Sequence, residues 1–189
     1  MSAAYCLAAP GSPLHGPYHD TEYGFPSRDE AILFERLVLE INQAGLSWAT
    51  ILKKRAAFRA AYAGFEVDRV AAFGLEDVDR LMNDAGIIRN RLKIAAAIDN
   101  ARRIQQLRQE YGGFAAWLDA HHPSSLPDWI KLFRKSFRFT GGEIVNEFLM
   151  SLGYLGGAHD ETCPVYARIA ALRPPWAEPA RHDERRSPN

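Results

Sequence analysis

The chain has 189 residues, of which 47% are hydrophobic and 24% charged, the proportions of a soluble globular protein with one sizeable core. It contains no run of eighteen apolar residues, which excludes a membrane-spanning helix, and its start lacks the basic and apolar stretches of a signal peptide. The chain has 23 basic residues (lysine and arginine) and 23 acidic residues (aspartate and glutamate). This balance of charge argues mildly against a nucleic-acid partner. Because the start does not resemble a signal peptide, we expect a cytoplasmic protein.

Hydrophobic periodicity predicts helices along most of the chain. The first clear helix spans residues 29–43, where apolar side chains recur every three or four positions. Gly45 suits the left-handed position after this helix, and Ser47 is a favourable cap for a second helix that ends near Phe58. Further helices are predicted at residues 68–73 with Asp68 as N-cap, 76–84, 90–108, 114–121, 128–136 and 143–152.

No alternating apolar and polar run of convincing length occurs, so we predict an all-α chain. One domain is expected over residues 1–172. Proline and charge dominate residues 173–189, and we predict a poorly ordered, flexible C-terminal tail there.

Two cysteines and two histidines lie near the chain ends. Cys6 precedes His19 by twelve intervening residues, and His159 precedes Cys163 by three. Two thiolates and two imidazoles suit tetrahedral Zn²⁺, and the second pair is close enough for one turn to supply both ligands. Two unrelated buried cysteines or one disulfide are the alternatives, and a reducing compartment argues against the disulfide. A shared zinc ion would clasp the two termini together.

Residues 81–94 join two predicted helices through a very short turn around Gly86. Gly86 permits a left-handed conformation or a close backbone approach. The N–H groups that begin the second helix would then be free to bind an anion, surrounded by Arg89, Arg91 and Lys93. This combination is typical of a helix-hairpin-helix element, which binds DNA phosphate without reading sequence. A plain helix corner with solvated charges is the alternative.

Glu40 lies at the edge of the apolar stripe of helix 29–43, where a carboxylate is either solvated or directed into a cavity. Tyr18, Tyr23 and Trp48 are candidates for a stacking cage around such a cavity. Face stacking combined with a carboxylate that accepts hydrogen bonds from an exocyclic amine is how a flipped purine is recognised. Each aromatic residue taken singly is more typical of a core position.

Together these residues resemble 3-methyladenine DNA glycosylase I, the Tag family of the helix-hairpin-helix superfamily. The matching stretches are residues 18–26, 39–52 and 84–94 and the closing His159-x3-Cys163, all in the same order. The resemblance implies the helix-hairpin-helix glycosylase fold, with a structural zinc on Cys6, His19, His159 and Cys163. It places Tyr18, Glu40 and Trp48 at the base-binding positions of the family, and Tyr23 where tryptophan is usual.

Several residues depart from the pattern of the family. Ile41 stands where glycine or another small residue is usual, and we expect it to narrow or reshape the cavity beside Glu40. Gly142 stands where proline or threonine is usual, and Glu143 stands where threonine is usual. Residues 146–150 lack the usual glutamine, and Ala8 replaces a tryptophan. Most of these changes are expected at the lesion pocket, so the resemblance predicts fold and metal more firmly than substrate.

The implied activity is hydrolysis of the N-glycosidic bond of 3-methyladenine in double-stranded DNA, as part of DNA repair by a monomer. Methylation at N3 makes the purine cationic, so it departs as a neutral base and general-acid help is less necessary. We assign Glu40 to base recognition and to catalysis, through electrostatic stabilisation or activation of water. No lysine is placed as a Schiff-base nucleophile, so no strand cleavage is expected.

Three other interpretations are open. The first is a zinc-clasped DNA-binding module that recognises altered bases without excising them. The second is a glycosylase with shifted lesion specificity. The third is a catalytic zinc, which is disfavoured because four protein ligands leave no position for water.

Overall fold

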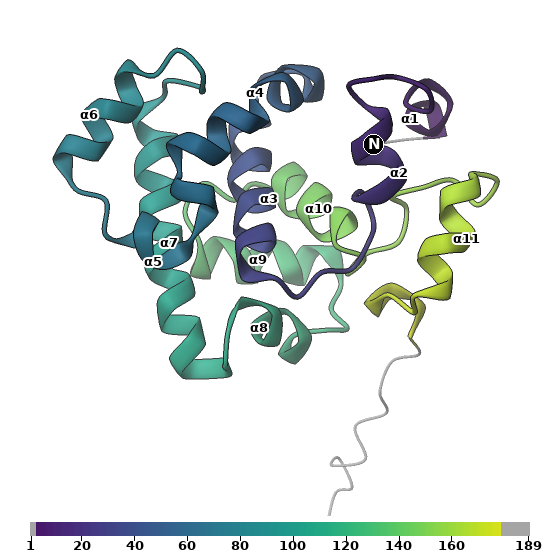
Figure 1. The fold of residues 1–189 in the computed structure, drawn as a ribbon. Helices are drawn as coiled ribbons and strands as arrows, with labels where there is room; N and C mark the ends of the chain where they lie inside the picture. Colours follow the sequence, from purple (N-terminus) through teal and green to yellow (C-terminus); the bar gives the residue numbers. More distant parts are fainter. Residues whose placement is uncertain (1–2, 179–189) are drawn as a thin grey trace, which may run out of the picture.

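The computed structural model describes residues 3–178. Every regular element in this range is helical, which confirms the predicted all-α class (Figure 1). The elements in chain order are α1 (Ala3–Ala8), α2 (Gly16–Thr21), α3 (Glu30–Gln43), α4 (Trp48–Ala61), η1 (Ala63–Phe65), α5 (Val67–Ala71), α6 (Leu75–Asn83), α7 (Arg91–Tyr111), α8 (Phe114–Ala120), α9 (Leu126–Ser136), α10 (Gly142–Ser151), α11 (Pro164–Ala171) and η2 (Pro175–Ala177).

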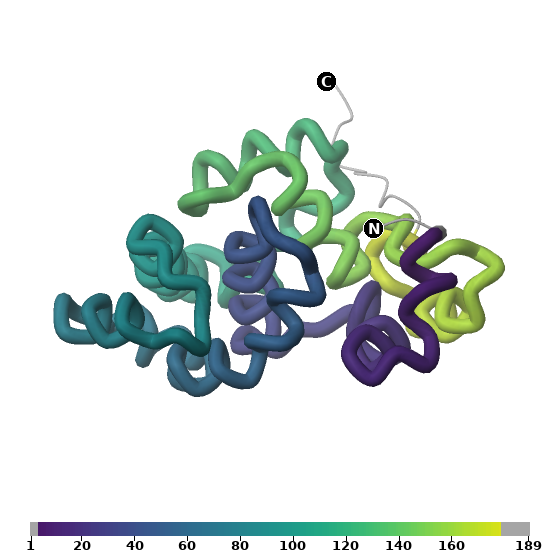
Figure 2. The backbone as a smooth tube through the Cα atoms, turned by 90° about the horizontal axis from the view of Figure 1, so that it is seen from above, coloured from purple at the N-terminus to yellow at the C-terminus, as the bar shows by residue number. Residues whose placement is uncertain are grey.

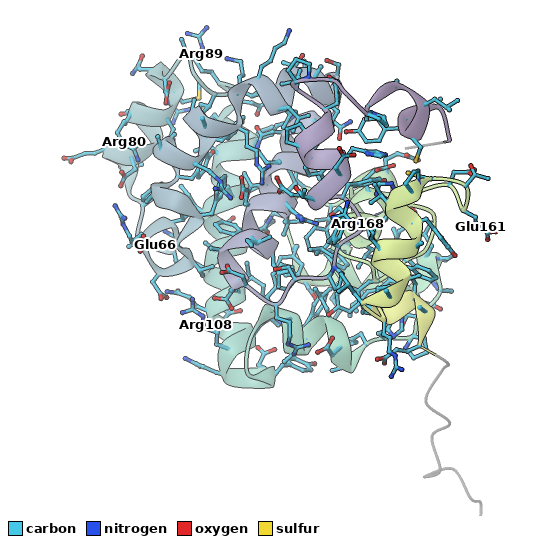
Figure 3. The ribbon with its side chains drawn as sticks, turned by 45° about the vertical axis from the view of Figure 1, so that its right-hand side comes forward. Glu66, Arg80, Arg89, Arg108, Glu161 and Arg168 are labelled. Atoms are coloured by element: carbon cyan, nitrogen blue, oxygen red, sulfur yellow. The ribbon has the colours of Figure 1, made fainter. Side chains whose placement is uncertain are left out.

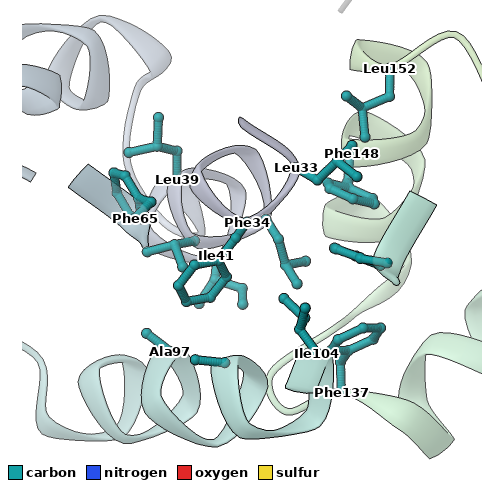
Figure 4. Packing of buried hydrophobic residues seen from close by; sticks show 14 of the residues in the cluster. Leu33, Phe34, Leu39, Ile41, Phe65, Ala97, Ile104, Phe137, Phe148 and Leu152 are labelled. Atoms are coloured by element: carbon teal, nitrogen blue, oxygen red, sulfur yellow. The ribbon is translucent and has the colours of Figure 1, made fainter. Parts of the chain in front are cut away.

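Helix α3 is the centre of the fold and contacts α4, α5, α7, α8 and α10. It begins where the Asp29 carboxylate accepts hydrogen bonds from the N–H groups of Ala31 and Ile32 at 2.9 and 3.1 Å, an N-cap interaction that satisfies two otherwise free donors. Its apolar residues from Leu33 to Ile41 are buried. Figure 4 shows Phe34 and Ile41 of α3 in the core beside Ala97 of α7. This packing fixes α3, and with it Glu40, against the rest of the protein.

The chain ends meet on one side of the molecule. Helices α1 and α2 lie beside α11 in Figure 1, and the view from above in Figure 2 shows the same neighbourhood. The N–H group of Gly24, just after α2, donates to the carbonyl of Ser151 at the end of α10 at 2.9 Å. Segments separated by most of the sequence therefore form one structural unit.

The predicted tail begins too early. Residues 173–178 belong to the described structure: the N–H group of Trp176 donates to the carbonyl of Gly153 at 3.1 Å, and its ring lies 5.7 Å from that of Tyr166. Trp176 therefore packs against α11 and the turn after α10. The rest of the predicted tail, residues 179–189, lies outside the described residues.

The predicted cap at Asp68 is also wrong. Helix α5 begins one residue earlier, after Glu66, and Asp68 lies inside its first turn. The Asp68 carboxylate instead forms an ion pair with Arg108 of α7 at 2.7 Å. None of the helices described over residues 3–178 combines the length and apolar character that crossing a membrane requires.

Candidate functional site

Glu40 lies on the last full turn of α3 and is only 3% exposed. One carboxyl oxygen, Oε1, is buried without a hydrogen-bond partner. Burial raises the pKa of this carboxyl, the charge of Glu147 adds to the rise, and the charge of Arg36 opposes both; the resulting pKa is about 8. A buried polar oxygen without a partner costs stability, so the fold alone gives no reason for a glutamate at this position.

The predicted aromatic residues gather behind Glu40. The rings of Tyr18 on α2 and Trp48 on α4 lie 5.0 Å apart between centroids at 54°, and Tyr23 lies 5.7 Å from Tyr18. The Tyr18 hydroxyl and the Trp48 indole nitrogen are buried and, like Glu40, lack hydrogen-bond partners. Such groups are few in folded proteins. Of the five such side-chain atoms in the described residues, three belong to predicted base-binding residues.

A cavity of about 360 Å³ opens above Glu40. Its walls come from the end of α3 and the turn after it, and from the first two turns of α10. The lining residues are Glu40, Gln43, Ala44, Gly45, Leu46, Glu143, Ile144 and Glu147. The aromatic residues do not line this cavity; they are buried behind it. The Tyr23 hydroxyl joins the two layers, since it donates to Glu147 Oε2 at 3.0 Å.

One predicted feature of the pocket is wrong. Ile41 does not narrow the cavity, because its side chain points away from it into the core and is 1% exposed. Ile41 directly follows Glu40 on the helix, and successive side chains are about 100° apart around the axis. Glu143 does line the cavity, whereas Gly142 packs near Ile130 of α9.

A wider groove of about 660 Å³ lies between α2 and α4 and contains three arginines. Two of them are already paired: Arg55 with Glu22 and Glu35, and Arg59 with Glu35, at 2.6 to 2.8 Å. These hydrogen bonds hold the pKa of Glu35 below its ordinary value against the effect of its burial. The groove is therefore built around internal ion pairs that join α2, α3 and α4.

The four predicted metal ligands converge at the junction of the chain ends. Their ligand atoms all lie within 4.8 Å of one another. The distance from Cys163 Sγ to His19 Nε2 is 3.8 Å, and His159 Nδ1 lies 3.7 Å from the sulfurs of both Cys6 and Cys163. Tetrahedral zinc with ordinary bond lengths places sulfur and nitrogen ligands about 3.6 Å apart. The donor set and its spacing therefore fit this ion.

The second nitrogen of each histidine is fixed by another group. The Nδ1–H of His19 donates to Asp20 at 2.6 Å, and the Nε2–H of His159 donates to the carbonyl of Tyr23 at 2.7 Å. Such partners select the tautomer that turns the other nitrogen toward a metal. The bond from His159 also ties the cluster to Tyr23, the residue that contacts Glu147.

The predicted hairpin lies between α6 and α7, but its donors are largely occupied. The N–H groups of Leu92 and Lys93 donate to the side chain of Asn90 at 3.0 and 3.2 Å. The N–H of Gly86 donates to Asp84 at 2.7 Å. The expected free N–H groups at the start of α7 are thus partly used by its own N-cap.

Lys93 is wrong as a phosphate contact. It is 6% exposed, and its ammonium donates to the carbonyls of Asn42 and Ala44 at 3.1 and 3.0 Å. Burial lowers its pKa. Lys93 therefore supports the last turn of α3, while Arg89 and Arg91 are exposed, Arg91 with only a 3.4 Å contact to Asp79. Figure 3 shows Arg89 at the outer edge of the molecule.

Gly86 makes its close approach inside the protein. A Cβ atom built at this position would lie 2.8 Å from the Cβ of Ala57 on α4 and 2.9 Å from Asp84 Oδ1. The glycine is therefore required by the packing of the hairpin against α4. A contact with DNA is not needed to explain it.

Residues 8–131 match the family described as methyladenine glycosylase. The chain belongs to this family. It is 40% identical over 160 residues to DNA-3-methyladenine glycosylase 1 of Escherichia coli (strain K12), covering 75% of this chain and 86% of that protein. It is 32% identical over 166 residues to DNA-3-methyladenine glycosylase of Haemophilus influenzae, covering 78% and 89%.

Solved structures of 3-methyladenine DNA glycosylase I have the same fold. The Staphylococcus aureus enzyme is 30% identical, with a TM-score of 0.78, and the match covers 88% of this chain and 98% of that one. A tyrosine-to-phenylalanine variant in complex with 3-methyladenine has a TM-score of 0.79 at 30% identity, covering 86% and 97%. The glycosylase fold expected from the sequence is confirmed.

One residue of the cavity wall and one residue beside Glu40 were not singled out from the sequence. Glu147 lies half-buried in the cavity wall on α10, and Arg36 is buried one helical turn before Glu40. Glu143 and Glu147 are four residues apart on a helix, which places them on one face. That spacing is visible in the sequence, but nothing in it shows that α10 faces the end of α3. Arg36 gave no signal, because it falls within the apolar stripe.

Proposed function

We propose that the protein is a DNA repair enzyme that hydrolyses the N-glycosidic bond of 3-methyladenine in double-stranded DNA, releasing the base and leaving an abasic site. Membership of the family and the names of its relatives support this activity. The observation that carries it furthest is the buried, unpartnered carboxyl oxygen of Glu40 beneath an open cavity. A base turned out of the duplex would bring the missing N–H donor.

The reaction depends more on the positioning of the base than on proton transfer to it. Adenine methylated at N3 is cationic while attached to the sugar, and it becomes neutral when the bond electrons leave with it. Glu40 accepts an N–H hydrogen bond from this base, and its negative charge favours the cation over normal adenine. The same charge stabilises the positive charge that develops on the sugar. Tyr18 and Trp48 form the aromatic wall behind the carboxyl.

Ionisation of Glu40 is coupled to binding. With a pKa of about 8, the carboxyl of the free pocket is mostly protonated near neutral pH. A cationic base counters the burial and the repulsion from Glu147 that raise this pKa, so its arrival favours the ionised form. Neutral adenine brings no such compensation, which gives the pocket a means to discriminate against it.

We further infer that Cys6, His19, His159 and Cys163 hold one structural Zn²⁺. The ion would supply cross-linking of the chain ends and no step of the reaction, because four protein ligands leave no place for water. The hydrogen bond from His159 to Tyr23 would transmit this support to the pocket wall.

The remaining assignments concern the whole enzyme. DNA phosphates are proposed to contact Arg89 and Arg91 at the hairpin. A monomer with a single domain over residues 1–172, extended by the packed residues 173–178, is the simplest arrangement.

Incubation of the purified protein with N-methylated duplex DNA, followed by chromatography of the released bases, tests the function. Free 3-methyladenine should appear, and the DNA strands should stay intact until abasic sites are cleaved by alkali. Retained duplex affinity with no released base would instead support a DNA-binding module.

A further inference from the structure

The groove between α2 and α4, with a volume of about 660 Å³, is separate from the cavity above Glu40: the two have no lining residue in common. Its walls combine charge with apolar surface. The guanidinium groups are those of Arg36, Arg55 and Arg59, and the apolar side chains are those of Phe25, Pro26, Ile32 and Leu52. A ligand that fills this groove would therefore join a charged group to an apolar part.

The groove holds one positive charge more than its internal ion pairs use. Glu22 pairs with Arg55 at 2.6 Å, and Glu35 pairs with Arg55 at 2.8 Å and with Arg59 at 2.6 Å. Two carboxylates thus neutralise two of the three arginines. Among residues 3–178, no carboxylate forms an ion pair with Arg36. The third cation is left without a counter-charge.

Arg36 also lacks hydrogen-bond acceptors. Its side chain is 5% exposed; Nη1 donates to the carbonyl of Ser151, while Nε is buried without a partner. A guanidinium carries five N–H donors and stays charged, and a buried charge without partners is costly. The Ser151 carbonyl also accepts the N–H of Gly24 at 2.9 Å, so it does not depend on Arg36. The fold alone therefore gives no reason for a guanidinium here.

Arg59 shows what such a guanidinium edge binds. Its Nε and Nη2 donate to the two oxygens of Glu35 at 2.8 and 2.6 Å, the paired bonds with which arginine recognises carboxylates and phosphates. The Nε of Arg36 has no acceptor of this kind. An oxyanion supplied by a ligand would provide the missing acceptors and offset the excess positive charge.

We propose that the groove between α2 and α4 binds a small organic oxyanion, a carboxylate or a phosphate monoester with an apolar substituent, and that Arg36 binds its oxygens. The substituent packs against the apolar side of the groove, where Ile32 and Leu52 lie. Because the groove shares no lining residue with the cavity above Glu40, this inference stands independently of the proposed base excision.

Benzoate and phenyl phosphate are suitable probes, because each joins an oxyanion to a flat apolar ring. Benzyl alcohol has the ring without the charge, and inorganic phosphate has the charge without the ring, so these two compounds are the matched controls. Dissociation constants can be measured by titrating isotope-labelled protein at constant ionic strength and following its assigned amide resonances. Those of Thr21, Ser27 and Leu52 report on the groove, and those of Gly45 and Ile144 report on the cavity above Glu40.

Two substitutions of Arg36 separate its charge from its paired donors. Arg36→Met removes the guanidinium but keeps an unbranched stem, and it should weaken binding of both probes about ten- to a hundredfold, the loss expected for charge-assisted hydrogen bonds. Arg36→Lys keeps the charge without the fork of donors and should be intermediate. Arg69→Met, at an exposed arginine on α5, should bind as wild type does.

Stability without ligand gives a second readout. Arg36→Met removes a buried charge that has no carboxylate partner, so it should be at least as stable as wild type in urea denaturation. Arg55→Met should be less stable than wild type, because it leaves the carboxylates of Glu22 and Glu35 with fewer partners. A loss of stability in Arg36→Met as large as in Arg55→Met would show that Arg36 serves the fold and would overturn the proposal.

Equal affinity of wild type and Arg36→Met for the probes would also overturn it, as would the absence of saturable binding by wild type. Resonance shifts centred on Gly45 and Ile144 would contradict it, because the ligand would then lie in the other cavity. Benzyl alcohol that binds as tightly as benzoate would contradict it too, since charge would play no part. If Arg36→Met does not fold, Arg36→Lys and the comparison of charged with uncharged probes still decide. The tighter of the two aromatic oxyanions identifies the preferred head group as carboxylate or phosphate.

Discussion

Glu40 combines deep burial with a side chain that is ordinarily charged at neutral pH, and the surrounding residues make that charge costly. If it recognises the flipped base, Glu40→Gln keeps the shape but removes the negative charge and one acceptor. Charge-assisted hydrogen bonds are worth about 1.5–3 kcal/mol, so single-turnover excision of 3-methyladenine should fall by about one to two orders of magnitude. Duplex affinity, which phosphate contacts dominate, should change little. Excision as fast as in wild type would show that Glu40 lies outside the reacting site.

The raised pKa of Glu40 predicts how the free energy of unfolding depends on pH. Because its pKa is raised from 4.5 to about 8, the folded protein keeps a proton that the unfolded chain loses. Stability from this group is complete below about pH 4.5 and is lost as the pH rises through 8. Relative to Glu40→Gln, the free energy of unfolding of wild type should fall by roughly 1 kcal/mol per pH unit between about pH 5 and pH 8. Urea denaturation across this range checks it, and parallel profiles would contradict it.

Residue identity was predictable where a short local pattern carried the chemistry. The two cysteines and two histidines were identified as candidate metal ligands from composition and spacing. Glu40 was identified as a candidate pocket residue from its place at the edge of an apolar stripe. Lys93 was misassigned because the sequence shows only that it is basic and near a turn. Its partners, the carbonyls of Asn42 and Ala44, lie some fifty residues earlier, and no local pattern reports such a contact.

At the scale of elements, Lys93 joins the start of α7 to the end of α3. Lys93→Met keeps the aliphatic stem but removes two charge-assisted hydrogen bonds. The protein should lose about 1.5–3 kcal/mol of unfolding free energy. Lys135→Met, an exposed lysine on α9, should change it by less than about 0.5 kcal/mol. Urea denaturation measures both, and a Lys93→Met protein as stable as wild type would refute this role.

The hairpin offers a prediction about DNA. Arg89 is exposed beside the turn, so Arg89→Ala should weaken duplex binding equally for all sequences. It should also reduce the slope of log affinity against log salt by about 1, as expected for one lost phosphate contact. Arg69→Ala on α5 removes an exposed arginine away from the hairpin and should have no such effect. Fluorescence anisotropy at several salt concentrations distinguishes them, and equal slopes would place the hairpin outside the interface.

Helix boundaries were predictable where a capping residue marks them. Ser47 caps its helix as predicted, and Asp29 and Asn90, the first residues of two predicted helices, are N-caps as well: each accepts hydrogen bonds from N–H groups of the first turn. The cap at Asn90 also explains why the N–H groups of the expected anion site are partly used. Helices α1, α2 and α11 were missed because they are short and are held by tertiary contacts, without a long apolar stripe of their own.

The whole molecule is expected to depend on the junction of its ends. Protein prepared without chelator should contain about one Zn²⁺ per chain, and Cys163→Ala should lose it, whereas the neighbouring Thr162→Ala should not. Chelation should lower the melting temperature while circular dichroism retains most of the helical signal, because the core around α3 does not depend on the metal. Elemental analysis that finds no zinc in wild type would refute the site.

For the molecule as a whole, the fold class followed from helical periodicity, and the meeting of the termini from the split ligand pattern. The cavity did not follow from either. Its second wall is α10, and the pairing of α10 with α3 depends on how Phe148, Leu33 and their neighbours pack. Glu143 and Glu147 become pocket residues only through that packing.

The contact between His159 and Tyr23 has a consequence for how the enzyme is made. The two residues are 136 positions apart, so Tyr23 leaves the ribosome long before the residue that fixes it. The central helices are able to form while synthesis continues, but the wall behind Glu40 has to wait for the last part of the polypeptide. Nascent chains that stop before His159 therefore lack a finished pocket. We therefore expect only completed chains to bind a base, because His159 is synthesised near the end of translation.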